Sequence, residues 1–227
     1  MYAFNTAAAN PVTGVNTITI SPPTGALVIV FSITSGGGGT PTVVFSDNSS
    51  STWANASNNV NVGGNHFSVG YCLAAAAGVT TITATYNGGT PGACNLVAIA
   101  YTGMSSPTFV ALTAPNAQTA PGTGANLVTT TALACGSTNA LFVGMHADTT
   151  NANDGLTVGT GFTLRANLIS GANTTQVYLQ DPNAEVTGSN TSTMTVASHG
   201  ADTYGSIGIA FADNASGGGT ATIAWVT

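Results

Sequence analysis

Apolar and polar residues alternate along much of this chain. The clearest stretches are Thr17–Ile20, Thr80–Thr85 and Ile207–Ile209, where every second position is apolar or small. A period of two is typical of a β-strand with one buried face. The longest apolar run, Ala26–Phe31, indicates one fully buried strand. Breaks rich in Gly, Pro and Asn recur about every eight to twelve residues, and this spacing predicts an all-β sandwich or barrel.

The composition favours strands and leaves little room for helix. Thr, Val and Ile supply 67 of the 227 residues, whereas Glu, Lys, Gln and Arg together supply five. Branched side chains at Cβ suit a pleated sheet, and long polar side chains normally cover helix surfaces. We therefore expect an all-β chain with minimal helix, built as antiparallel β-sandwiches of the jelly-roll or Ig-like type.

An internal repeat divides the chain into two halves. Five features occur twice in the same order, at offsets of about 107 to 114 residues. The matching segments are 24–30 with 138–143, Trp53 with Phe162, 69–73 with 176–179, 81–83 with 193–195, and 97–101 with 207–211. The repeat predicts two tandem sandwich domains of ordinary domain size. Their expected bounds are 1–104 with an N-terminal extension, a linker at 105–124, a second sandwich at 125–213, and a tether with a last strand at 214–227.

The last segment has no counterpart in the first half. A Gly-rich tether leads into Thr220–Thr227, where Ile223 and Trp225 would share one face of a strand. This strand either folds back onto its own second domain or completes a sheet in a neighbouring subunit by strand addition. Tyr2–Phe4 could play the same part from the other end. The residues assigned to the assembly strand are Thr220, Thr222, Ile223, Trp225 and Val226.

Charge is nearly absent. One Lys or Arg stands against seven Asp and Glu, charged residues make up 4% of the chain, and the net charge is −6. Binding to nucleic acid or to an anionic membrane surface requires several basic side chains, and Arg165 is the only one, so both are excluded. No apolar run approaches the roughly 18 residues of a membrane-spanning helix, so we expect no membrane insertion.

Three motifs follow one another in the first half: the strand 25–30, Ser46-Asp47-Asn48 followed by Trp53, and the strand 95–101 closed by Thr102-Gly103. Their order resembles the β-sandwich domains that occur in tandem in secreted and cell-surface proteins of environmental bacteria, and the resemblance covers about residues 15–213. The resemblance implies an extracellular structural or adhesive module and does not imply catalysis.

Three cysteines leave at least one thiol without an intramolecular partner. Cys72 and Cys94 both flank strands of the first half, so a disulfide between them is our expectation in a secreted protein. Three pairings are open, and Cys135 could be buried, reactive or paired across subunits. None of the spacings is of the zinc-binding type.

Catalytic motifs are absent from the sequence. His66, His146 and His199 are far apart, and neither a Gly-x-Ser-x-Gly elbow nor a His-Glu-x-x-His motif occurs. Glu185 is the sole glutamate, so a facing pair of catalytic carboxylates is not indicated. We therefore expect no enzymatic activity and no cofactor.

One segment resembles a calcium loop. Asp148, Asn151, Asn153 and Asp154 gather oxygen ligands before Gly155, although the order of an EF-hand is not met. An ordinary turn is the favoured interpretation. Asp47 and Asn48 predict an Asx-type turn in the first half.

Two features of the sequence bear on sugars: glycosylation sequons and an exposed-aromatic candidate. Five Asn-x-Ser/Thr sequons, at Asn48, Asn55, Asn173, Asn190 and Asn214, are about as many as chance supplies, yet glycans there would make an uncharged surface more hydrophilic. Trp53, followed by an Asn-rich stretch, could also form a sugar-binding platform, although a core position is favoured.

These observations give two hypotheses for function. The first is a structural subunit of an extracellular filament or surface assembly, a homopolymer formed by strand addition or exchange, because few charges oppose self-association and no lysine guards the sheet edges. The alternative is a carbohydrate-binding or adhesive module on a cell or phage surface, with glycans as partners.

Overall fold

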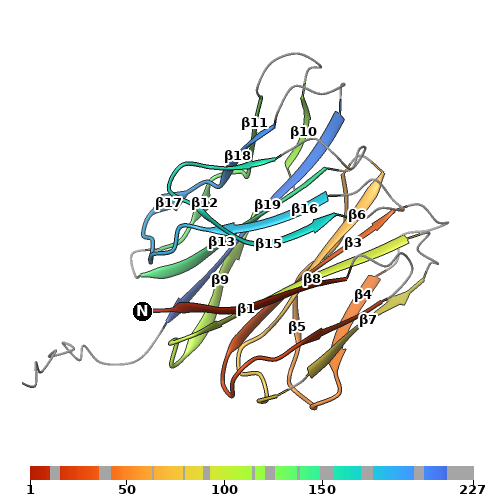
Figure 1. The fold of residues 1–227 in the computed structure, drawn as a ribbon, viewed down its shortest axis with the longest axis vertical. Coiled ribbons are helices and arrows are strands. Elements are labelled where there is room, and N and C mark those ends of the chain that lie inside the picture. Colours follow the sequence, from red (N-terminus) through yellow and green to blue (C-terminus); the bar gives the residue numbers. More distant parts are fainter. Residues whose placement is uncertain are drawn as a thin grey trace, which may run out of the picture.

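The chain folds into antiparallel β-sheets stacked in four layers, as Figure 1 shows for our computed structural model. The structure describes residues 1–10, 16–35, 42–62, 64–78, 80–88, 93–113, 116–120, 126–136, 139–148, 156–169, 176–196 and 202–213. Within these ranges there is no helix, and therefore none that could span a membrane.

The strands fall into two halves. Those of the first half are β1 (Ala3–Asn10), β2 (Thr17–Ile20), β3 (Leu27–Ser35), β4 (Thr42–Asp47), β5 (Ala54–Val62), β6 (Asn65–Cys72), β7 (Thr80–Asn87) and β8 (Ala93–Thr102). Those of the second half are β9 (Pro107–Leu112), β10 (Asn116–Ala120), β11 (Asn126–Thr129), β12 (Leu133–Ala134), β13 (Ala140–Asp148), β14 (Thr157–Val158), β15 (Thr163–Ile169), β16 (Gln176–Asp181), β17 (Ser189–Asn190), β18 (Thr193–Val196) and β19 (Asp202–Asp213).

Each half contains one large and one small three-stranded sheet with the same connectivity. The large sheets have the orders β1-β8-β3-β6-β5 and β10-β19-β13-β16-β15, and β9 also pairs with β19. The small sheets have the orders β2-β7-β4 and β11-β18-β14, while β12 and β17 form a separate pair. All five sequence matches fall on, or directly before, corresponding strands, which supports the internal repeat. The all-β, antiparallel sandwich class is confirmed.

Strand β3 shows why the chain stacks in four layers. Leu27, Ile29 and Phe31 point to one face and belong to the central core, whereas Val28 and Val30 point to the other and pack against the small sheet of the same half. Because both faces are apolar, both must be covered. The expectation of a fully buried strand from the run of apolar residues is confirmed.

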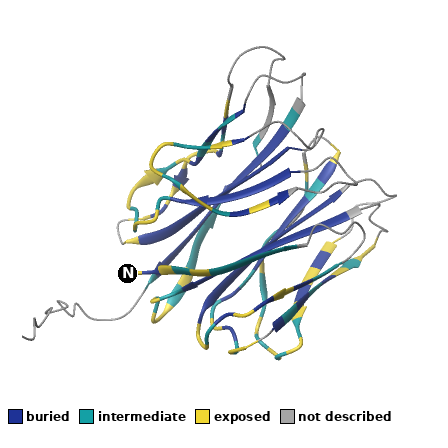
Figure 2. Ribbon diagram, viewed as in Figure 1, coloured by how far each residue is buried: buried dark blue, intermediate teal, exposed yellow. Residues whose placement is uncertain are grey.

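Strand β13 repeats this arrangement in the second half. Leu141, Val143 and Met145 join the same central core as β3, while Ala140 and Phe142 lie in an outer core. The two large sheets therefore face each other and share one core. The halves are joined face to face, and Figure 2 shows the buried strands of both large sheets side by side at the centre.

The predicted linker is wrong. Segment 105–124 contributes β9 and β10, and both pair with β19 of the second large sheet. The N-terminal segment, for which the role of a donor strand was one possibility, enters β1 at Ala3, and β1 pairs with β8 of its own chain. Each of these segments pairs with a strand of its own chain. The pairing supplies hydrogen bonds to backbone N–H and C=O groups that a free connector or arm would leave without protein partners. The tether and last strand, 214–227, lie outside the described residues.

Candidate functional site

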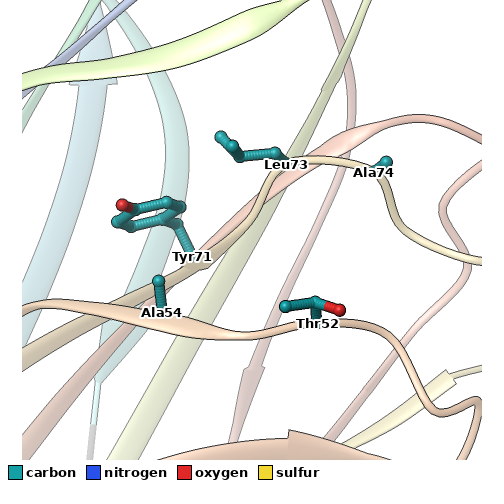
Figure 3. Close-up of a pocket in the computed structure, with 5 residues that line it drawn as sticks. All are labelled: Thr52, Ala54, Tyr71, Leu73 and Ala74. Carbon is teal, nitrogen blue, oxygen red and sulfur yellow. The ribbon is translucent and has the colours of Figure 1, made fainter.

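A pocket opens at the end of the first large sheet. Thr52 and Ala54 line it where β5 begins, Tyr71 lines it from β6, and Leu73 and Ala74 follow β6 in the chain (Figure 3). Its volume is about 260 Å³. None of these side chains is charged, so the pocket is suited to an apolar or aromatic group.

Tyr71 is held in place by the second half of the chain. Its ring stacks on Phe109 with 5.3 Å between centroids and makes a T-shaped contact with Phe211 at 5.2 Å between centroids. Burial raises the pKa of the Tyr71 hydroxyl, so the group is neutral at physiological pH. The position of the aromatic wall of the pocket therefore depends on contacts with β9 and β19.

Trp53 lies next to this pocket in the sequence, but its indole is already engaged. Nε1 donates a 3.0 Å hydrogen bond to Oδ2 of Asp47, and the ring packs beside Phe45 at 6.4 Å. Asp47 also accepts hydrogen bonds from the backbone N–H of Ser49 and Ser51, so the predicted Asx-type turn is confirmed. Burial raises the pKa of Asp47, but hydrogen bonds from Ser51, Trp53 and Ser49 outweigh it and hold that pKa below its ordinary value.

A second cluster joins the two halves through charge. Arg165 on β15 makes a bidentate pair with Asp181 on β16, at 2.8 Å from Nε and 2.9 Å from the terminal nitrogen. The guanidinium carbon also lies 4.8 Å from the centre of the Phe4 ring of β1. Tyr101 of β8 donates to Asp181, and burial next to that carboxylate raises the pKa of Tyr101 well above its ordinary value.

The same cluster holds the start of the chain. The Tyr2 hydroxyl donates a 2.7 Å hydrogen bond to the carbonyl of Ala184, and the amino group of Met1 lies 3.0 Å from Oε1 of Glu185. Strand β1 is thus bound both to its own sheet and to the second half. The sequence offers one signal for this cluster: Arg165 is its only Lys or Arg, and a buried cation needs a carboxylate partner.

His146 lies in a closed polar network. Nδ1 is 2.9 Å from Oγ of Ser206, Nε2 is 2.8 Å from Oγ of Ser192, and Gln180 donates to that same Ser192 oxygen. His146 is fully buried, and burial lowers its pKa to about 3. Gly144 makes room for this contact, since a Cβ there would lie 2.0 Å from the Ser192 oxygen. Both ring nitrogens of His146 are therefore engaged by serine hydroxyls inside the chain.

The remaining histidines are not brought to this network. His66 lies on β6 in the first half, and His199 lies outside the described residues. The part of the chain that the structure describes holds no group of three or more His, Cys, Asp or Glu side chains arranged for a metal.

The expected disulfide is wrong. The structure has Cys72, Cys94 and Cys135 as free, buried thiols. Cys72 pairs in register with Val28 of β3, and Cys94 with Thr34 of the same strand. Six residues of strand correspond to about 20 Å, far beyond the roughly 7 Å that a disulfide can bridge.

Of the calcium candidates, only Asp148 is described, and it is fully buried at the end of β13. Asn151, Asn153 and Asp154 lie outside the described residues.

The described sequons differ in how their side chains are used. Nδ2 of Asn55 donates to the carbonyl of Val43 at 2.7 Å, and Nδ2 of Asn190 donates to that of Thr187 at 3.0 Å. Asn48 is exposed and uses its oxygen, which accepts from the N–H of Thr81. A glycan is attached through Nδ2, so Asn48 is the described sequon best suited to carry one. Asn173 and Asn214 lie outside the described residues.

Comparison with known proteins adds no further assignment. No protein-family model, curated protein or solved structure matches this chain.

Proposed function

We propose that this protein is a structural subunit of an extracellular assembly, and that its copies join through their β-sheets by strand addition. The observation that carries the proposal is that the described charged side chains are buried or bonded within the chain. Eight side chains of the sequence are ionic, and those whose surroundings are described are buried or engaged within the chain. They are Asp47, Asp148, Arg165, Asp181, Glu185 and Asp213.

Unguarded sheet edges give the second support. Strands β4 and β11 are edge strands of the small sheets, and neither has a shift in register. Each exposes a large apolar side chain, Val44 at 49% and Leu127 at 64%. Natural edge strands are normally protected by Lys, Pro, inward charges or bulges. Strand β5 has two such bulges, whereas β4 and β11 have none.

The alternative of a carbohydrate-binding module has less support. Trp53, its candidate platform, is partly buried and donates its indole N–H to Asp47. The pocket at Tyr71 offers few of the polar groups that sugars require. The extracellular location is part of the proposal and rests on the Thr-, Ser- and Asn-rich composition and on the resemblance described above.

The test is the association state of the full-length chain. Fibres or large oligomers should form from about 0.05 M to about 1 M NaCl, because few surface charges are available for salt to screen. Deleting residues 214–227 should abolish them. A full-length chain that stays monomeric at high concentration in electron micrographs and sedimentation would overturn the proposal.

A further inference from the structure

The pocket at Tyr71 lies close to the end of the last described strand. The rings of Phe211 of β19 and Tyr71 make a T-shaped contact with 5.2 Å between their centroids, and β19 ends two residues later at Asp213. The chain therefore leaves the second large sheet two residues after a side chain that contacts the aromatic wall of the pocket. The 14 residues that follow include Thr220–Thr227, which has no charged side chain and contains Ile223 and Trp225.

The pocket and this segment match in chemistry. The pocket walls carry no charge and include one aromatic ring, that of Tyr71. Its volume of about 260 Å³ equals that of roughly nine water molecules, enough for one large side chain. An indole would place an apolar body against Leu73 and Ala54 and bring its N–H toward polar groups at the rim.

We infer that the Tyr71 pocket receives Trp225 from a neighbouring copy of the chain. This inference rests on the proposed function and adds the receptor site to it. From Asp213 to Trp225 the chain spans up to about 40 Å when extended, so the segment can cross from one copy to the next. Every copy has one pocket and one donor segment. When copies join head to tail, the copy at one end keeps a free pocket and the copy at the other end keeps a free donor segment, so further copies can add and an open chain grows.

Two complementary variants of the full-length chain test this. Trp225→Ala keeps the pocket but removes the donor side chain. Ala74→Trp, at an exposed position on the pocket wall, fills the pocket but keeps the donor. Each variant alone should be monomeric in sedimentation, whereas an equimolar mixture should form a dimer that grows no further. Ala77→Trp, at an exposed position in the same loop outside the pocket, is the matched control and should assemble as the wild type does.

A peptide measurement separates the site from the assembly. The synthetic peptide of residues 220–227 should bind the Trp225→Ala chain with one site per chain, and its own Trp225→Ala form should bind at least 10-fold more weakly. Truncating the neighbouring Val226 to Ala in the same peptide should change binding less than 3-fold. Ala54→Phe provides a second blocked pocket, and thermal melting confirms that each variant is folded.

The outcomes are distinct. If the wild type assembles and the blocked variants assemble equally well, the pocket is not the receptor, although the proposed function stands. If the peptide binds but the wild type is monomeric and the mixture gives no dimer, the segment docks onto its own chain, which overturns both the exchange and the proposed function. If neither peptide nor partner binds, the inference is wrong.

Discussion

The hydroxyl of Tyr101 donates a 2.7 Å hydrogen bond to Oδ2 of Asp181, and the two side chains belong to opposite halves of the chain. Asp181 is fully buried, as is Tyr101, and Arg165 occupies the same carboxylate from the other side. Arg165 and Asp181 pair within the second half, and Tyr101 and Phe4 of the first half contact the pair. Both charges of this ion pair are therefore used inside the chain, at the contact between the halves.

Replacing Asp181 by Asn should destabilise the fold strongly. The substitution leaves the half-buried Arg165 cation without its counter-ion, and breaking such a pair typically costs about 3 kcal/mol or more. The free energy of unfolding, measured by urea denaturation, should fall by about that amount.

Tyr101→Phe is the matched control for this change. It keeps the ion pair and removes one hydrogen bond to a charged group, so the expected loss is smaller, about 1.5 kcal/mol. Equal losses for the two variants would show that the ion pair adds no stability beyond that of the Tyr101 hydrogen bond.

The His146 network predicts how stability depends on pH. The pKa of His146 is about 3 in the folded chain, below the ordinary value of about 6.5 expected in the unfolded chain. Between these values the unfolded state binds one more proton, so the contribution is complete above about pH 6.5 and is lost as the pH falls toward 3. The slope should reach about 1.4 kcal/mol per pH unit.

The dependence of the free energy of unfolding on pH, rather than its absolute value, shows whether His146 is the group that titrates. His146→Asn removes the titrating group, so its free energy of unfolding should vary with pH between about 4.5 and 6.5 much less than that of the wild type, whatever its absolute value. Urea denaturation at several pH values gives both slopes. An unchanged slope in the variant would assign the acid sensitivity to another group.

Gly70 is required by the packing of Phe45. A Cβ at position 70 would lie 2.2 Å from the Phe45 ring, so Gly70→Ala should lower the free energy of unfolding by about 1 to 3 kcal/mol. Phe45→Leu removes ring atoms that the new methyl group would meet. The losses of the double variant should therefore be less than additive, and full additivity in urea denaturation would contradict the contact.

The sequence predicted the strands better than their assembly. Period-two patterns and the run of apolar residues at 26–31 identify strands because side-chain alternation is local information. That the two large sheets share a core could not be read from the pattern, since a strand buried on both faces shows the same composition whatever covers it. The linker was mistaken because Pro-containing edge strands, such as β9, are rich in the residues of connectors.

The candidate site was missed for a related reason. Tyr71 was recognised as part of a strand, but its stacking on Phe109 depends on how the halves dock, which the sequence does not show. The disulfide prediction was wrong because strand register cannot be read from the sequence. Cys72 and Cys94 lie on the two strands that flank β3, but they pair with positions six residues apart along it. A carboxylate partner for Arg165 could have been predicted from the sequence, because only a few carboxylates are present to neutralise it.

The burial of the three cysteines predicts how many thiols can be alkylated, and intact mass measures that number. Cys72, Cys94 and Cys135 are buried, and burial raises the pKa of each thiol, so the reactive thiolate is scarce and shielded. Iodoacetamide should add no label to the native chain at neutral pH and three labels in denaturant, as read by intact mass. Treatment of the native chain with a mild oxidant should leave all three available to label after unfolding. A loss of two labels, with Cys72 and Cys94 recovered in one disulfide-linked peptide, would contradict the register of β3 with β6 and β8.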